Sequence, residues 1–252
     1  MHLNPEILKP RAEEVLRYMG WKRKEVATDE YAVFLERAEK ELAELKLLIN
    51  PKYIYSSLDK RANPELFQEL FGERNPEINP EINPGVNPGI NPGVNSEEDT
   101  ERDSEMNLKR NSNDGIRKFI CDFEKVYLGA VTLGFEYENI LKAAGSGDSS
   151  RLLLLESCGT ELIESAMNLV EEEIRELESS PVSSRFSPGY GGWDLSHQRK
   201  ILDYLQASRL GIYLNDYNLM IPRKSVTAVI KMAGFNQGCG SCDKLDCDFR
   251  KI

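Results

Sequence analysis

The chain has 252 residues, which is enough for one large domain or two small ones. Its formal net charge of −10 and its pI of about 5.0 argue against a nucleic-acid-binding surface. No apolar run approaches the roughly 20 residues that span a bilayer, and the first residues lack the apolar core of a signal peptide. We therefore expect a cytoplasmic protein that binds neither nucleic acid nor membrane.

The first 70 residues are mostly helical by pattern. A short helix is predicted over Arg11–Met19, and a longer one runs from an Asp29 cap to about Ile49, with apolar residues three and four apart. Pro51 ends it. Tyr53 to Tyr55 then predict a short strand.

A polar insertion interrupts this pattern. Residues 75–94 hold five tandem copies of Asn-Pro-[Glu/Gly]-[Ile/Val], and proline at every fourth position forbids a regular helix. A repeat segment of this kind is either a ligand for a partner or, more commonly, only a linker. We interpret residues 74–114 as a flexible insertion between two parts of one domain, 1–73 and 115–234, with a cysteine-rich tail at 235–252.

Regular structure resumes after the insertion. Val126–Leu133 is apolar on both faces and predicts a buried strand, followed by a helix over about Glu136–Ala144. Asp148 is placed to cap the longest helix, which extends to about Leu177. Gly159, inside the apolar stripe of that helix, predicts the close approach of another backbone. The stripe comprises Leu152, Leu155, Gly159, Leu162, Ile163, Ala166, Val170, Ile174 and Leu177.

The last third predicts a further helix and two strands. Asp194 is placed to cap a helix that runs to about Leu210, with Leu195, Leu202 and Leu205 facing inward and Gly211 just after it. Strands are expected over about Ile212–Tyr217 and Ser225–Met232. Helices and strands do not alternate regularly, so the fold class is α+β rather than a doubly wound sheet.

The segment Arg185-Phe-Ser-Pro-Gly-Tyr-Gly-Gly192 carries the strongest functional signal. Glycines on both sides of Tyr190, after a proline, allow a sharp turn and a close approach of the backbone to a ligand. Arg185 offers a rigid fork of donors for a carboxylate or phosphate, and Tyr190 offers a flat ring. This combination suits a small zwitterionic ligand with an aromatic part; the alternative is a surface turn.

The tail contains Cys239, Cys242 and Cys247. Cys-x2-Cys is a common half-site for zinc or an iron–sulfur cluster because the two thiolates converge on one ion. Three thiolates are an incomplete tetrahedral set, which Cys121, Cys158 or a partner would complete. Reactive free thiols are the alternative.

These motifs, in this order, resemble the activation (reactivation) domain of cobalamin-dependent methionine synthase, in a free-standing form with a cysteine-rich tail. The resemblance rests on Arg17-Tyr-Met-Gly20, Val131-Thr-Leu-Gly134, the Arg185 segment, and Met220-Ile-Pro-Arg-Lys-Ser-Val226. It implies a twisted antiparallel sheet flanked by helices that binds S-adenosylmethionine. Arg185, Ser187, Gly189, Tyr190 and Glu164 would line the site, with Arg185 facing the ligand's carboxylate and Glu164 its amino or sulfonium group.

The resemblance also implies a function in reductive methylation. The chain would act as a methyltransferase component, with S-adenosylmethionine as the methyl donor for the oxidised cobalamin of a separate methionine synthase or related corrinoid protein. The electron would come from a flavodoxin-like or ferredoxin-like donor. Two family positions lack a clear counterpart here, an N-terminal acidic contact and a late tyrosine. The alternative function is a non-catalytic metal-binding adaptor on the same fold.

Several of these residues also have simpler interpretations. Glu164 lies among charged residues that ordinarily form a solvated helix face, and Arg185 alone would make a surface salt bridge. Tyr190 is a candidate packing residue at the turn. Arg223 and Lys224 form a small basic spot that would meet a corrinoid phosphate or an acidic partner, although exposed loop charges are the simpler expectation. His197 is given no role.

Overall fold

The computed structural model describes residues 1–22, 28–72, 114–120, 123–145, 148–179 and 182–232. Helices and strands are mixed, which confirms the α+β class. The helices are α1 (Ala12–Tyr18), α2 (Asp29–Leu48), α3 (Pro64–Phe71), α5 (Asp114–Ile120), α6 (Phe135–Ala144), α7 (Ser149–Glu178) and α8 (His197–Leu205), with 3₁₀ turns η1 (Pro5–Ile7) and η3 (Ala207–Leu210). The strands are β1 (Lys52–Asp59), β2 (Lys125–Thr132), β3 (Val182–Phe186), β4 (Tyr213–Leu214), β5 (Met220–Ile221) and β6 (Ser225–Met232).

Four strands form an antiparallel sheet in the order β1-β2-β6-β3, and β4 pairs with β5 in a small separate hairpin. The two central strands are buried on both faces, as predicted for Val126–Leu133. Alternate residues of β2 enter two different cores: Tyr127 and Val131 face one, and Val126 and Leu128 face the other.

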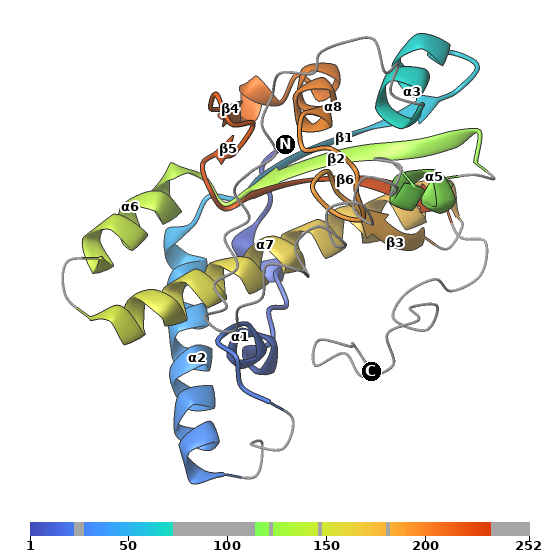
Figure 1. The fold of residues 1–252 in the computed structure, drawn as a ribbon. Coiled ribbons are helices and arrows are strands. Elements are labelled where there is room, and N and C mark those ends of the chain that lie inside the picture. Colours follow the sequence, from blue (N-terminus) through green and yellow to red (C-terminus); the bar gives the residue numbers. More distant parts are fainter. Residues whose placement is uncertain (23–27, 73–113, 121–122, 146–147, 180–181, 233–252) are drawn as a thin grey trace, which may run out of the picture.

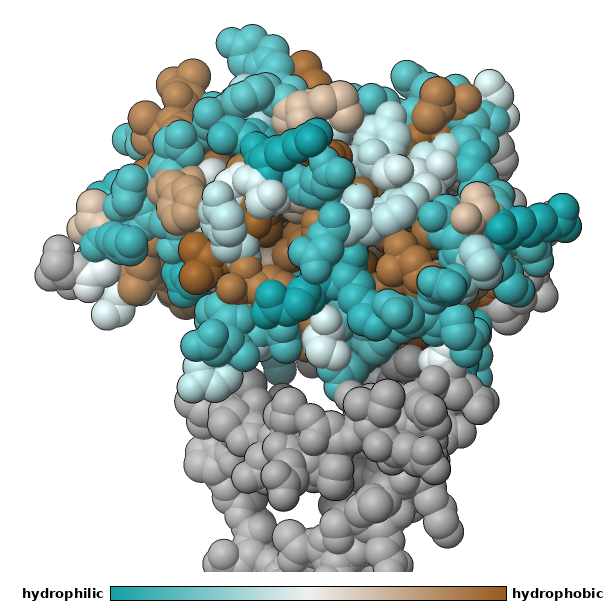
Figure 2. Space-filling view, turned by 90° about the horizontal axis from the view of Figure 1, so that it is seen from above, coloured by the Kyte–Doolittle hydropathy of each residue, from teal (hydrophilic) through white to brown (hydrophobic). Residues whose placement is uncertain are grey.

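Helices cover both faces of this sheet (Figure 1). Helix α7 runs along one face, with α1 and α2 packed beyond it, and this core includes Leu16, Leu42 and Leu162. Helices α3 and α8 lie on the other face, where Trp193 and Ile201 are buried. Seen from the side of α3 and α8, the surface is mainly hydrophilic with apolar patches between polar side chains (Figure 2). None of the helices in the described ranges is both long and apolar enough to cross a membrane.

The long helix follows its sequence prediction closely. The Asp148 carboxylate accepts hydrogen bonds from Ser150 N at 2.9 Å and Arg151 N at 3.2 Å, so it is the cap. Two details of the prediction are wrong. Leu177 is 63% exposed, because it lies in the last turn beyond the core. The close approach at Gly159 is made by the ring of Tyr137 rather than by a backbone.

Other boundaries also differ from the prediction. Helix α2 is capped by Thr28 instead of Asp29, because the Thr28 hydroxyl accepts from Tyr31 N at 3.2 Å. The helix predicted from Asp194 to Leu210 is shorter, since Gln206 has a left-handed φ of 53° that separates α8 from η3. The Asp194 carboxylate instead accepts from Ser196 N, before the helix begins.

The strand predicted over 212–217 is reduced to the two residues of β4. The Asn215 side chain accepts from Tyr217 N at 3.0 Å and from Leu219 N at 2.9 Å, which turns the chain into the β4–β5 hairpin. Helices α3 and α5 and strands β3 and β5 were not predicted as elements. The cysteine-rich tail and residues 74–113 of the predicted insertion, which include the Asn-Pro repeat, lie outside the described residues. Asp114, the last residue of the predicted insertion, begins α5.

Candidate functional site

The Arg185 segment joins an edge strand to a tight turn. Arg185 belongs to β3 and pairs with Ile230 of the central strand β6. The chain then turns through Gly189, Gly191 and Gly192, all with φ between 51° and 92°. Residues other than glycine rarely adopt a positive φ of this size, so the turn requires glycine at these positions. Three backbone hydrogen bonds close it, from Gly189 N to Trp193 O at 2.7 Å, from Trp193 N to Tyr190 O at 2.8 Å and from Tyr190 N to Ser187 O at 3.3 Å.

Trp193 anchors this turn to the core. Its side chain is 1% exposed, and its Nε1 donates to the carbonyl of Leu70 at 3.0 Å. The turn is thereby fixed to α3 on one side, while β3 is fixed to the sheet on the other. A rigid corner of this kind holds the residues before it, Arg185 to Pro188, in a defined position.

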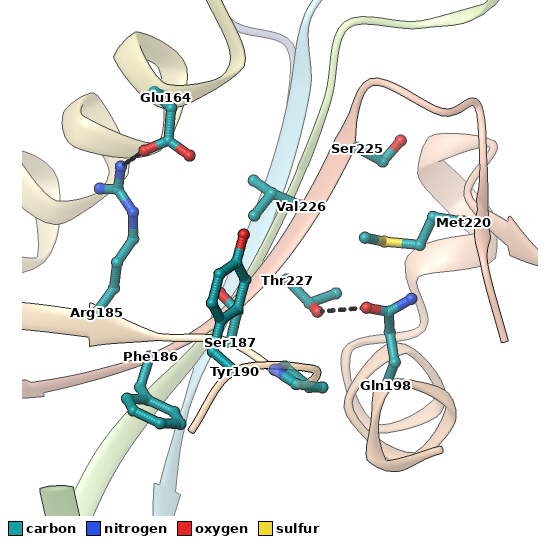
Figure 3. A pocket seen from close by; sticks show the side chains of 11 residues that line it. Glu164, Arg185, Phe186, Ser187, Tyr190, Gln198, Met220, Ser225, Val226 and Thr227 are labelled. Atoms are coloured by element: carbon teal, nitrogen blue, oxygen red, sulfur yellow. Dashed lines mark hydrogen bonds and ion pairs between the residues drawn. The ribbon is translucent and has the colours of Figure 1, made fainter. Parts of the chain in front are cut away.

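A pocket of about 480 Å³ opens beside the corner (Figure 3). It contains four of the five residues that the sequence predicted for a ligand site, namely Glu164, Arg185, Ser187 and Tyr190. Gly189 shapes the turn but does not line the pocket. The remaining walls were not predicted: Phe186 and Pro188 from the segment itself, Gln198 from α8, Met220 from β5, and Ser225, Val226 and Thr227 from β6.

One end of the pocket is charged. The Arg185 side chain is 16% exposed and its guanidinium turns toward α7, where it pairs with Glu164 and lies 2.7 Å from Glu171. It also donates to Asn168 Oδ1 at 2.8 Å. Burial lowers the pKa of Arg185, but the two carboxylates more than compensate and leave it raised above its ordinary value. Two carboxylates surround one cation, so the cluster of Arg185, Glu164 and Glu171 carries a net charge of −1, and this end of the pocket favours a cationic ligand group.

These contacts change the interpretation of Arg185. The sequence predicted that the guanidinium of Arg185 binds a ligand carboxylate. In the structure the guanidinium donates hydrogen bonds to Glu164, Asn168 and Glu171 instead. These three contacts use three of the five N–H groups of a guanidinium, so a ligand carboxylate would have to bind the others. Glu164 keeps a side-chain exposure of 32% and lines the pocket, so its carboxylate is accessible from inside.

The other end of the pocket is polar but uncharged. Gln198 is 5% exposed and Thr227 is 1% exposed, and Thr227 Oγ1 contacts Gln198 Oε1 at 3.4 Å. Sequence reasoning missed both residues. A signal was present for Gln198, because it lies three and four residues before Ile201 and Leu202, on the inward face of α8. A polar residue on an apolar helix face is a candidate site residue.

Apolar and aromatic groups separate the two ends. Val226 and the ring of Tyr190 lie between the two ends, whereas Met220 forms part of the wall beside Gln198 at the uncharged end (Figure 3). Tyr190 is 70% exposed, so it is not a packing residue of the turn. The pocket therefore suits an elongated ligand with a cationic group at one end and a flat, uncharged, polar group at the other.

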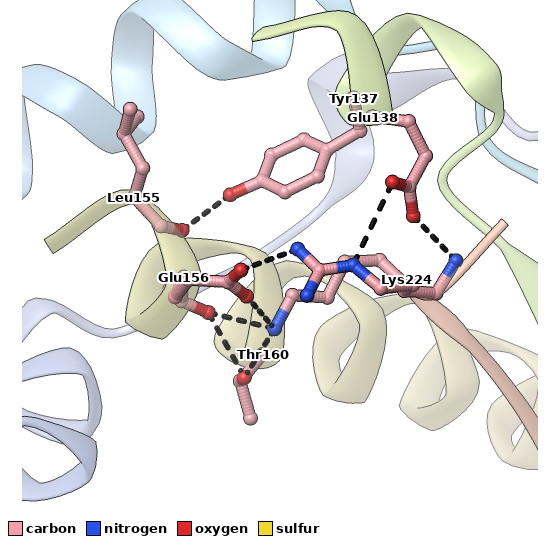
Figure 4. Close-up of polar contacts among 7 residues, drawn as sticks. Tyr137, Glu138, Leu155, Glu156, Thr160 and Lys224 are labelled. Carbon is pink, nitrogen blue, oxygen red and sulfur yellow. Dashed lines mark hydrogen bonds and ion pairs between the residues drawn. The ribbon is translucent and has the colours of Figure 1, made fainter. Parts of the chain in front are cut away.

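A cluster of ion pairs holds the loop that follows β5, the strand that carries Met220. Arg223 lies 2.5 Å from Glu156, and its backbone N donates to Glu138 at 2.5 Å. Lys224 Nζ lies 2.9 Å from Glu156 and donates to Thr160 at 3.0 Å (Figure 4). Burial tends to raise the pKa of Glu156, but hydrogen bonds from the two cations outweigh burial and lower it. The predicted basic spot is thus neutralised within the protein.

The predicted metal site falls outside the described residues, since Cys239, Cys242 and Cys247 all lie in the tail. Within the described ranges, no cluster of three or more His, Cys, Asp or Glu side chains could hold a metal ion. Cys158 is fully buried in α7, and burial raises its pKa to about 12, which disfavours the thiolate that a metal requires. His197 contacts Asp194 O at 3.0 Å, as suits a residue at the start of a helix.

The fold has a known counterpart. A crystal structure described as the MetH reactivation domain bound to AdoHcy is similar to this chain, with a TM-score of 0.54 and 13% sequence identity. The similarity covers 91% of this chain and 76% of the other. At this identity the comparison shows a shared fold. No family model and no curated protein matches the sequence.

Proposed function

We propose that this chain binds S-adenosylmethionine in the pocket beside Arg185. The observation that carries the proposal is the convergence of Glu164, Arg185, Ser187 and Tyr190 on one pocket, in a fold shared with a reactivation domain bound to AdoHcy. The charges of the pocket support this ligand. A sulfonium and an ammonium group suit the end with excess negative charge, and the adenosine suits the uncharged end.

The proposed activity is reductive methylation of a corrinoid on a separate protein. The chain would serve as a reactivation component for a cobalamin-dependent methionine synthase or a related corrinoid protein, with the electron supplied by a flavodoxin-like or ferredoxin-like donor. S-Adenosylmethionine supplies an electrophilic methyl group on a positively charged sulfur. The residues of this chain contribute binding and orientation, because such a methyl donor needs neither a side-chain nucleophile nor a general base.

Within this proposal Glu164 contacts the ligand and Arg185 is a positioning residue. Arg185 connects Glu164 to Glu171 and Asn168 on α7, and β3 fixes Arg185 to the sheet. The carboxylate of Glu164 is thereby held at the wall of the pocket before any ligand arrives. Such preorganisation raises affinity because less ordering is needed on binding.

Calorimetric titration with S-adenosylmethionine and S-adenosylhomocysteine tests the proposal. The wild type should bind both, and Glu164→Gln should weaken binding of S-adenosylmethionine by about 1–3 kcal/mol through loss of a charge-assisted contact. Glu172→Gln is the matched control, because Glu172 is an exposed residue of the same helix that does not line the pocket. Absence of binding by the folded wild type at millimolar ligand would refute the proposal.

A second experiment tests the activity. The chain is mixed with a corrinoid protein carrying oxidised cobalamin, a reductant and S-adenosylmethionine, and the absorbance spectrum of the corrinoid is followed. We expect methylated corrinoid to form faster with the chain present than without it. Equal rates, in a preparation that binds S-adenosylmethionine, would reject the reactivation function while leaving ligand binding intact.

A further inference from the structure

The uncharged end of the pocket has a feature that bears on ligand specificity. Gln198 and Thr227 are both more than nine-tenths buried, although both line the pocket. They come from different elements, α8 and β6, and meet through their side-chain oxygens (Figure 3). Buried polar groups ordinarily have hydrogen-bond partners, so the way this pair is satisfied determines what it can offer to a ligand.

The orientation of the Gln198 amide is fixed from outside the pocket. Its Nε2 donates to the backbone carbonyl of Asn218 at 2.9 Å, in the turn of the β4–β5 hairpin. A carbonyl oxygen can only accept a hydrogen bond, so it requires the nitrogen end of the amide on that side. Gln198 Oε1 therefore points the other way, toward Thr227 and the pocket.

Hydrogen-bond acceptors consequently predominate at this end. The hydroxyl of Thr227 donates to Gln198 Oε1, which leaves lone pairs on both oxygens. The nearby hydroxyl of Ser225 is already engaged with Thr132 at 2.8 Å and Pro222 O at 2.7 Å. The site thus suits a ligand that brings a hydrogen-bond donor. The donor should be uncharged, because the carboxylates that would compensate an ammonium group lie at the opposite end.

We infer that Gln198 and Thr227 recognise the exocyclic amino group of adenine and make the pocket specific for a 6-amino purine over a 6-oxo purine. This inference rests on the proposed function, and it adds the base specificity of the same site. An amino group donates to the two oxygens. A 6-oxo group would place a third acceptor against them, and the amide cannot rotate to present its nitrogen without losing its bond to Asn218.

The test compares two ligands that differ only at this position. S-Adenosylhomocysteine and S-inosylhomocysteine, its 6-oxo analogue, are titrated into the full chain by calorimetry. We expect the wild type to bind the inosine compound about 10- to 100-fold more weakly. In Gln198→Met this ratio should fall to about threefold or less. The matched control is Gln68→Met, the same change at an exposed position of α3, which should keep the wild-type ratio.

The outcomes separate the inference from the proposed function. Equal affinity of the wild type for the two compounds would overturn the inference and leave the proposed function standing. Binding of neither compound would overturn both. Should Gln198→Met fail to fold, Thr227→Val removes one of the two acceptors with little change in shape, and the ratio should again fall. An unchanged ratio of the two affinities in a folded variant would overturn the inference, because other groups would then distinguish the two bases.

Discussion

The contact between Gly159 and Tyr137 gives a quantitative prediction about the helix that carries Glu164. A Cβ atom at position 159 would lie 2.6 Å from Cε1, Cζ and Oη of Tyr137. Non-bonded carbon atoms prefer about 3.5–4.0 Å, so the ring would have to move by about 1 Å. The ring is completely buried and its hydroxyl donates to Leu155 O, which leaves it no open space.

The expected effect of Gly159→Ala is the difference of opposing contributions. Alanine in a helix interior stabilises the folded protein by about 0.5–1 kcal/mol relative to glycine. Overpacking of a core costs about 1–3 kcal/mol, and disturbing the hydrogen bond of Tyr137 costs about 1 kcal/mol more. We therefore expect a net destabilisation of about 1–3 kcal/mol. For a chain of this size this corresponds to a fall in Tm of about 2–4 °C per kcal/mol.

Urea denaturation followed by circular dichroism measures this change. Gly145→Ala is the control, because its new Cβ would lie 3.5 Å from the nearest atom and its backbone is already α-helical. This control should be neutral or slightly stabilising. In a Tyr137→Leu background, where the ring is absent, Gly159→Ala should lose most of its cost. If Gly159→Ala were as stable as the wild type, the close packing of α6 against α7 would be refuted.

Two further predictions concern the pH dependence of stability and the anchor of the corner. In the folded protein the pKa of Glu156 lies below the ordinary glutamate value of 4.5. The contribution of Glu156 to the free energy of unfolding is therefore complete above pH 4.5 and is lost as the pH falls through the folded pKa. Glu156→Gln, which weakens the contacts to Arg223 and Lys224, should therefore flatten the fall in urea midpoint between about pH 5 and pH 3; an unchanged slope would contradict this. Trp193→Ala should lower the free energy of unfolding by about 3–5 kcal/mol. Trp193→Phe should lower it by about 1–3 kcal/mol, because Leu70 O loses its hydrogen-bond donor. Equal urea midpoints for Trp193→Phe and the wild type would count against that hydrogen bond.

The sequence predicted elements whose signals are local. The cap at Asp148 and the stripe of α7 were recognisable because both depend on spacing within one helix. The buried strand β2 and the strand β6 were recognisable from continuous runs of strand-forming residues. The turn glycines at 189, 191 and 192 were identified because few other residues adopt their conformation.

Edge and hairpin elements were not predictable in this way. Strand β3 is short, and its register is set by β6, which comes later in the chain. The helix predicted through Gln206 breaks there because η3 packs as a separate turn, with Ala207 and Leu210 in the core. Such tertiary contacts override local propensity.

By itself, then, the sequence determined the fold class, the glycine corner, and the residue types that gather around it. Only the tertiary structure decided how these residues are used. Glu164 and Arg185 are 21 positions apart and form an ion pair because α7 packs beside β3. Gln198 and Thr227 are 29 positions apart and meet only because α8 covers β6. Spacing along a chain carries no information on which distant groups satisfy one another, since that choice depends on how whole elements pack.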